Sequence, residues 1–166
     1  ELYSFGCNDQ GQLGIGSFMQ SCLPHKVKTL NNIEFFDCGA NYTLCKTING
    51  DVYCWGYNFN FVSNTEESLT APLLCRNWPD NVVDIKCGYF HALVLTSDQE
   101  VYSCGKNGFG QLGRKTNNLD LLYLSRIESL HDIIRIECGK NHSICIDINN
   151  DLYVFGYNFY GQLGLG

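Results

Sequence analysis

Histidine and cysteine are the side chains of this sequence best suited to chemistry. Histidine titrates near neutral pH and can act as a general base or a metal ligand. His91 and His142 each lie four residues after a Cys-Gly cysteine, and Tyr42 holds the same place in an earlier copy. A residue that recurs in successive units favours repeated packing over one catalytic site. We therefore interpret His91 and His142 as structural residues that are hydrogen-bonded to backbone.

The cysteine spacing favours neither a metal site nor a disulfide framework. Zinc sites use Cys-x2-Cys or similar spacings, whereas the nearest cysteines here are seven and nine residues apart. Cys38 with Cys45, and Cys138 with Cys145, could approach across a bend, but Val94 stands in the equivalent place of the middle unit. This indicates an apolar role, since buried thiols behave as small hydrophobes. We predict reduced core thiols and a cytoplasmic or nuclear location, with a disulfide-bonded secreted chain as the alternative.

Other catalytic and binding motifs point the same way. The sequence has no Gly-x-Ser-x-Gly elbow, and its glycine-rich loops lack the lysine and spacing of a phosphate-binding loop. The glycosylation sequons at 41–43 and 141–143 fall inside a repeated block, and we interpret them as coincidence. We predict no catalytic residue, no metal and no cofactor, and hence no enzyme activity.

Composition and charge exclude several classes of protein. Of the 166 residues 45% are hydrophobic and 17% are charged, which argues for a globular chain. No apolar run approaches the length of a membrane span. A net charge of −6, with no basic run longer than Arg114-Lys115, gives no attraction to phosphate backbones. The only methionine is Met19, and the opening residues look like the middle of a strand, so we expect a fragment of a longer chain.

A six-residue segment occurs four times with the pattern acidic, aliphatic, Tyr, variable, bulky, Gly. Its final glycines are 50, 49 and 51 residues apart, so the chain repeats a unit of about fifty residues. The alternation predicts a strand buried on both faces. The four copies lie at 1–6, 51–56, 100–105 and 151–156.

Two more strands are predicted ahead of this segment in each unit. A Cys-Gly-x-x-His/Tyr block leads into a short apolar run, and another apolar stretch precedes the block at 33–36, 82–85 and 133–136. Between the last two strands lie Asn49-Gly50, 97–99 and 149–150, residue types that tolerate the positive φ of tight hairpin turns.

A loop of defined shape is predicted after the repeated segment. Gly-x-Asn leads into Gly-Gln-Leu-Gly in three copies, at 6–14, 105–113 and 156–164, while the second unit keeps only Gly-x-Asn. Paired glycines at fixed offsets indicate positive φ or close packing rather than a flexible linker. A fourth, edge-type strand follows, with Pro24 and Pro72 near its start, and 123–127 takes that place in the third unit.

The spaced motifs closely resemble the regulator of chromosome condensation repeat, over nearly the whole chain. The resemblance implies an all-β fold of propeller blades, each of four antiparallel strands, and normally seven blades in a ring. We predict one partial propeller of about three blades over 1–166, with units at about 1–32 (partial), 33–81, 82–132 and 133–166 (partial). The missing blades are expected elsewhere in the parent protein.

Positions that vary on a repeated scaffold are candidates for partner contact. They lie in the loops between Gly-x-Asn and the next glycines, and local packing against a neighbouring blade is the alternative. The candidate contact residues are Asp9, Phe59, Phe61, Phe109, Phe159 and Tyr160. The positions assigned to structure are Gly6, Gly56, Gly105 and Gly156, then Gly39, Gly88 and Gly139, with His91 and His142.

Three functions remain open. The first is a non-catalytic protein-interaction module or scaffold, binding a partner protein or another domain of the same chain. The resemblance implies a second, guanine nucleotide exchange on a Ran-like small GTPase, although the even repeat spacing leaves no room for an inserted wedge. The third is a regulatory propeller of a ubiquitin ligase or kinase. Direct binding to nucleic acid or to a membrane is not expected.

Overall fold

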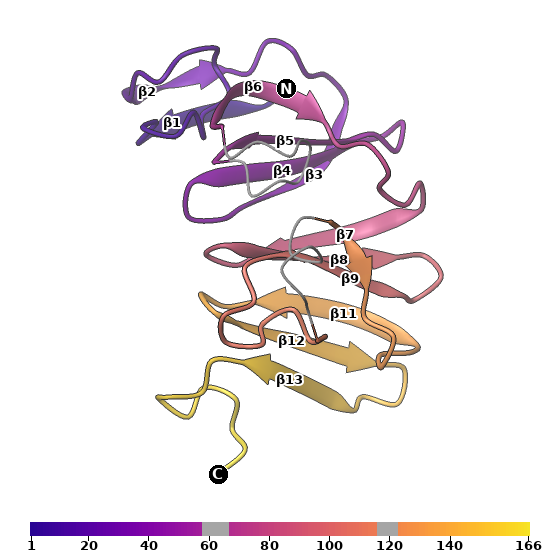
Figure 1. Cartoon of the computed structure of the whole chain (residues 1–166). Coiled ribbons are helices and arrows are strands. Elements are labelled where there is room, and N and C mark those ends of the chain that lie inside the picture. Colours follow the sequence, from indigo (N-terminus) through magenta and orange to yellow (C-terminus); the bar gives the residue numbers. More distant parts are fainter. Residues whose placement is uncertain (58–66, 116–122) are drawn as a thin grey trace. The chain divides into compact units, whose positions relative to one another are not determined.

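The computed structural model describes residues 1–57, 67–115 and 123–166, and its regular elements there are all β-strands (Figure 1). The chain divides into two compact units, Glu1–Asp80 and Asn81–Gly166. Within the described residues there is no helix long and apolar enough to cross a membrane. Because every regular element of the described residues is a β-strand, the all-β prediction is confirmed.

The first unit holds a two-stranded sheet and a four-stranded sheet, both antiparallel. In the four-stranded sheet the strands follow chain order, so each lies beside its neighbours in sequence. The strands are β1 (Tyr3–Gly6), β2 (Ser21–Lys26), β3 (Ile33–Cys38), β4 (Tyr42–Thr47), β5 (Val52–Gly56) and β6 (Leu69–Leu74).

The second unit repeats this plan with a four-stranded and a three-stranded antiparallel sheet. The two sheets pack face to face, as Figure 1 shows for β8 and β11. Its strands are β7 (Val82–Cys87), β8 (His91–Thr96), β9 (Val101–Gly105), β10 (Ser125–Arg126), β11 (Ile133–Cys138), β12 (His142–Asp147) and β13 (Leu152–Gly156).

The strand register is the same in every sheet that can be compared. The first strand of each blade carries a bulge one residue after its start, and its cysteine lies opposite residue 43, 92 or 143. The final glycine of the third strand lies opposite Tyr42, His91 or His142. The predicted four-stranded blade is therefore confirmed, with β10 shorter than the 123–127 strand expected from sequence.

The turns between second and third strands adopt the predicted conformation. Gly50, Gln99 and Asn150 have φ of 92°, 63° and 65°. A left-handed backbone suits Gly and Asn, which hold two of these places, and Gln99 adopts it in the third.

The hydrophobic core of each unit lies between successive sheets. In the second unit Leu93 and Val101 of one sheet pack with Ile133, Ile136 and Cys145 of the next. All five side chains are fully buried. In the first unit Trp55 packs with Leu2, Val27, Leu30 and Cys45. Burying each such aliphatic side chain stabilises the fold by about 1.5–3 kcal/mol, so a blade depends on its neighbour for much of its stability.

Candidate interaction surface

The Gly-x-Asn…Gly-Gln-Leu-Gly loops share one set of hydrogen bonds. In each, the asparagine Oδ1 accepts from the leucine N–H at 2.9 Å, as Asn107 does from Leu112. The glutamine Oε1 accepts from the backbone N–H two residues earlier, as Gln111 does from Phe109 at 2.9 Å. The recurring polar residues therefore fix the loop backbone, and the residues between them project from a defined frame.

Asn107 should control the order of its loop. Replacing it by alanine removes the acceptor of the Leu112 N–H, and Nδ2 also loses its bond to the Arg114 carbonyl at 3.1 Å. Leu112 is fully buried, so its N–H has no ready access to water, and we expect a loss of about 1–3 kcal/mol. Hydrogen exchange over 106–114 should become at least about fivefold faster. Asn107→Asp keeps the Oδ1 acceptor and should have the smaller effect; equal effects would show that this bond does not order the loop.

The residues at the loop tips are largely exposed to solvent. Phe109, Phe159 and Tyr160 are 52%, 78% and 82% exposed, and Asp9 is exposed in the first unit. Phe59 and Phe61 lie outside the described residues. Exposed aromatic side chains on a fixed backbone are well suited to contacting another molecule.

The exposed aromatics of the second unit form one cluster. The ring of Phe109 contacts Tyr157 edge to face, with centroids 4.7 Å apart, although the two residues come from consecutive loops. Phe159 and Tyr160 lie 5.1 Å apart, and each is within 6.3 Å of Tyr157. The sequence analysis did not select Tyr157. It occupies the x of Gly-x-Asn, where the other copies have Cys7, Tyr57 and Lys106, so the variation of this position was the available signal.

Two lysines lie over aromatic rings beside this cluster. Lys106 Nζ is 4.6 Å from the centroid of Phe90, and Lys140 Nζ is 4.9 Å from that of Tyr89. Tyr89 also contacts Phe90 edge to face at 4.4 Å. These four residues and Phe109 line a cavity of about 280 Å³, which we call the aromatic–lysine pocket.

The glycines assigned to structure have steric reasons for their identity. Gly56, Gly105 and Gly156 end the third strands with φ of 90–110°, and a Cβ there would lie 2.3–2.6 Å from a carbonyl oxygen of the preceding block. Gly6 has the same φ with open space around it. At Gly39, Gly88 and Gly139 a Cβ would lie 1.9–2.1 Å from the ring of Tyr42, His91 or His142. The ring three residues on rests on the glycine, so this pair is a packing unit.

His91 is fully buried and takes part in packing between blades. Its Nε2 lies 2.9 Å from Ser143 Oγ, and that hydroxyl donates to the carbonyl of Gln111 at 2.8 Å. Because the serine proton is used there, Nε2 carries the histidine proton and donates. The bond to a side chain differs from the backbone bond expected for His91. Burial, with the neighbouring His142, lowers the pKa of His91 to about 4, so it is neutral at pH 7.

Ser143 and Thr43, the hydroxyl residues of the two sequons, have a structural role. Each is buried, and each donates its hydroxyl to the carbonyl of the glutamine in a Gly-Gln-Leu-Gly loop, Gln111 at 2.8 Å and Gln12 at 3.2 Å. These hydroxyls join neighbouring sheets within a unit.

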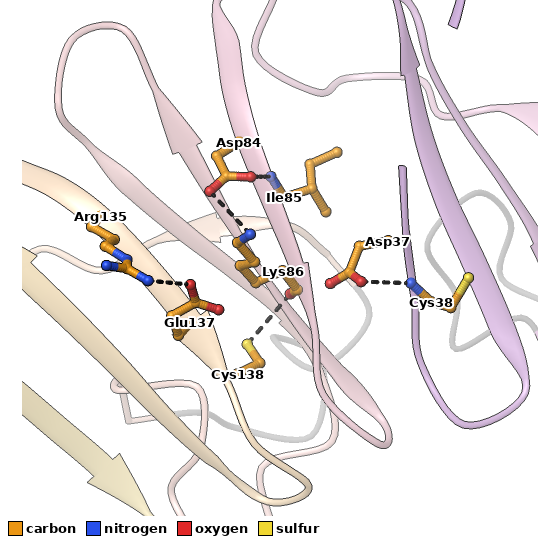
Figure 2. A network of polar contacts seen from close by, with 8 residues as sticks. All are labelled: Asp37, Cys38, Asp84, Ile85, Lys86, Arg135, Glu137 and Cys138. Atoms are coloured by element: carbon orange, nitrogen blue, oxygen red, sulfur yellow. Dashed lines mark hydrogen bonds and ion pairs between the residues drawn. The ribbon is translucent and has the colours of Figure 1, made fainter. Parts of the chain in front are cut away.

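Charged residues on the first strands of the second unit pair with one another (Figure 2). Asp84 accepts from the Ile85 N–H and lies 3.6 Å from Lys86 Nζ, while Arg135 contacts Glu137 at 3.1 Å. Lys86 also accepts, through its carbonyl, a bond from Cys138 Sγ at 3.4 Å. Burial raises the pKa of Asp84, and the Glu137 charge adds to the shift against the opposing effect of Lys86. Each ion pair balances charge within its own strand, β7 or β11.

All ten cysteines lie in the described part of the chain and are thiols there. Cys45, Cys54, Cys75, Cys104 and Cys145 are buried, and burial raises the pKa of Cys45 and Cys145 to about 12, which keeps these thiols protonated. The Cys-Gly cysteines are less buried than core thiols: Cys38 is exposed, and Cys87 and Cys138 are half-buried. Across 1–57, 67–115 and 123–166, no group of three His, Cys, Asp or Glu side chains is placed to hold a metal ion.

Repeated four-stranded antiparallel blades joined by glycine-fixed loops define a β-propeller type of protein. Models of the regulator of chromosome condensation (RCC1) repeat match residues 33–61, 82–111 and 133–162, and also 1–45 and 98–146. The chain belongs to the RCC1 repeat family, as its motifs predicted, and forms a partial propeller.

Three curated relatives cover the whole chain or nearly so. It is 31% identical to the ultraviolet-B receptor UVR8 of Arabidopsis thaliana, over 100% of this chain and 39% of that protein. It is 27% identical to an RCC2 homolog of Xenopus laevis, over 99% and 38%, and 28% identical to human HERC6, a probable E3 ubiquitin-protein ligase, over 99% and 17%. The chain thus spans about two fifths or less of these relatives.

Two solved structures share the fold. Human WBSCR16 superposes with a TM-score of 0.85 at 25% identity, over 99% of this chain and 49% of that one. Yeast RCC1 (Prp20), solved with Kap60, gives 0.87 at 24% identity, over 99% and 41%.

Proposed function

We propose that the chain is a non-catalytic protein-interaction part of an RCC1-type propeller, and that its partner docks on the aromatic loops of the second unit. The observation that carries this is the exposure of Phe109, Phe159 and Tyr160 on loops whose backbone is fixed by recurring hydrogen bonds. Such rings bury much area on binding and lose little conformational freedom.

The variety of the relatives supports a binding role. A photoreceptor, an RCC2 homolog and a probable ubiquitin ligase share these repeats, so the common element is the scaffold, and specific roles depend on its surfaces. The ligase relative is about six times longer than the matched part, which favours a second candidate: a regulatory propeller attached to a ubiquitin ligase or kinase domain. In that case the partner is another domain of the same chain.

A set of surface variants tests the docking face. The loop variant combines Phe109→Ser, Phe159→Ser and Tyr160→Ser, and the control combines Val83→Ser, Ile134→Ser and Ile148→Ser, apolar residues of the same unit that are also exposed. Partners captured from cell extract and then purified should bind the loop variant at least about tenfold more weakly, because three aromatic contacts are lost. The control should bind normally. Equal loss in both variants would contradict docking on these loops.

Nucleotide exchange is tested separately. The intact propeller is added to Ran loaded with a fluorescent guanine nucleotide, and release is followed with time. We expect the spontaneous rate. Faster release would overturn the non-catalytic part of the proposal and favour a Ran-like GTPase as the partner.

We further propose that the protein acts in the nucleus or cytoplasm and that other blades complete its ring. The ten thiols support the location, since disulfides rarely form there. The length of the relatives supports additional blades. The net charge of −6 and the lack of a basic run support a partner that is neither nucleic acid nor a membrane.

A further inference from the structure

The aromatic–lysine pocket combines apolar walls with local positive charge. Its lining includes the rings of Tyr89, Phe90 and Phe109 and the exposed amines of Lys106 and Lys140. Among the described residues, those that line the pocket include no aspartate or glutamate. On a chain with a net charge of −6, this is a small region of the opposite sign.

The pocket is assembled from two consecutive repeats, which fix its geometry. Tyr89 donates its N–H to the carbonyl of Lys140 at 3.0 Å, and the Lys106 N–H donates to the carbonyl of Phe90 at 2.8 Å. The backbones that carry both lysines are therefore tied to the backbones that carry the rings. The lysine side chains lie against those rings at 4.6 and 4.9 Å, which limits their freedom before any ligand binds.

We propose that the aromatic–lysine pocket binds an acidic peptide segment of a partner protein. An apolar side chain of the peptide packs against the rings of Tyr89, Phe90 and Phe109, and carboxylates on either side of it pair with Lys106 and Lys140. This deepens the proposed function and rests on it, since it names the chemistry that the docking face selects.

Size and charge favour a peptide over nucleic acid. A volume of about 280 Å³ accommodates one or two side chains, and the aromatic lining rewards an apolar group. Binding a phosphate backbone needs a longer track of positive charge than two lysines. A peptide with carboxylates beside one apolar side chain matches both the size and the charge of the pocket.

The test measures binding of a labelled peptide by fluorescence anisotropy. The probe carries one phenylalanine between two pairs of glutamates in a Gly-Ser background, and the comparison peptide has glutamine in place of each glutamate. We expect the acidic probe to bind at least about fivefold more tightly, from two partly exposed ion pairs. Lys106→Gln with Lys140→Gln should remove this preference. Lys28→Gln with Lys115→Gln changes the net charge equally at exposed lysines elsewhere and should leave it intact.

A second variant tests the apolar half of the pocket. Phe109→Ala should weaken binding of both peptides several-fold, whereas Ile148→Ala, an exposed residue of the same unit, should not. Hydrogen exchange should slow at 89–91 and 106–109 when the acidic probe is present. Protection confined to other segments would overturn the assignment of the pocket.

The remaining outcomes also decide the matter. Equal affinity of the two peptides, no binding of either, or equal loss in the two lysine pairs each overturns the proposal. Tighter binding of a labelled oligothymidine than of the acidic probe overturns it in favour of nucleic acid. If the natural partner is lost with the loop variant but kept with the Lys106 and Lys140 pair, the proposed function stands and this inference fails.

Discussion

Gly105→Ala should strongly destabilise the second unit. Gly105 has φ of +100°, and a Cβ there would lie 2.5 Å from the carbonyl oxygen of Phe90, which accepts the Lys106 N–H. The left-handed backbone costs an alanine about 1–3 kcal/mol, and relieving the clash costs about as much again. We expect a loss of at least about 3 kcal/mol, a large fraction of a domain's stability. Urea unfolding followed by circular dichroism measures it.

Gly108→Ala is the matched control for this prediction. Gly108 lies three residues further along the same loop, outside the positive-φ region, and a Cβ there would meet no atom within 4 Å. Its replacement should leave the urea midpoint unchanged or raise it slightly, because alanine restricts the unfolded chain. If both variants unfold at the same urea concentration, the steric explanation of the repeated strand-ending glycine is wrong.

Much of the blade was predictable because its constraints are local. Gly50 and Asn150 form turns and Asn107 with Gln111 fixes a loop through contacts within a few residues, and Gly105 ends a strand against Phe90 of the same repeat. Repetition of such residues marks them in the sequence even without a structure. The same repetition is the basis for interpreting His91 and His142 as structural residues rather than catalytic ones.

The pocket could not be predicted because its contacts join different repeats. Tyr89 meets Lys140 about fifty residues further along the chain, and Phe109 meets Tyr157 at a similar separation. Periodicity identifies equivalent positions, but it does not say which side chains of neighbouring blades face each other. A signal was present at 40–41, 89–90 and 140–141, where the residues after Cys-Gly vary as the loop tips do. The bond of His91 to Ser143 was missed for the same reason.

Lowering the pH from 7 to 5 should destabilise the second unit through His91. Histidine in the unfolded chain has a pKa of about 6.5, whereas burial lowers the pKa of His91 to about 4 in the fold. The unfolded state therefore takes up a proton that the folded state excludes. The stability is present in full above pH 6.5 and declines as the pH falls towards 4. Integration over this interval gives a loss of about 2 kcal/mol at pH 5.

His91→Gln isolates this effect. Glutamine retains an N–H donor for Ser143 but does not titrate, so the variant should be less stable at pH 7 and should lose about 2 kcal/mol less between pH 7 and 5. His131→Gln, at an exposed histidine of the same unit, is the control, and its loss of stability between pH 7 and 5 should match that of the parent chain. The raised pKa of Asp84 acts in the opposite direction, since protonation favours the folded state there, and it contributes equally to all three proteins. The difference between their hydrogen-exchange stabilities therefore reports on His91 and its interaction with the neighbouring His142. Parallel profiles for His91→Gln and the parent would show that the buried histidine is not the pH-sensitive group.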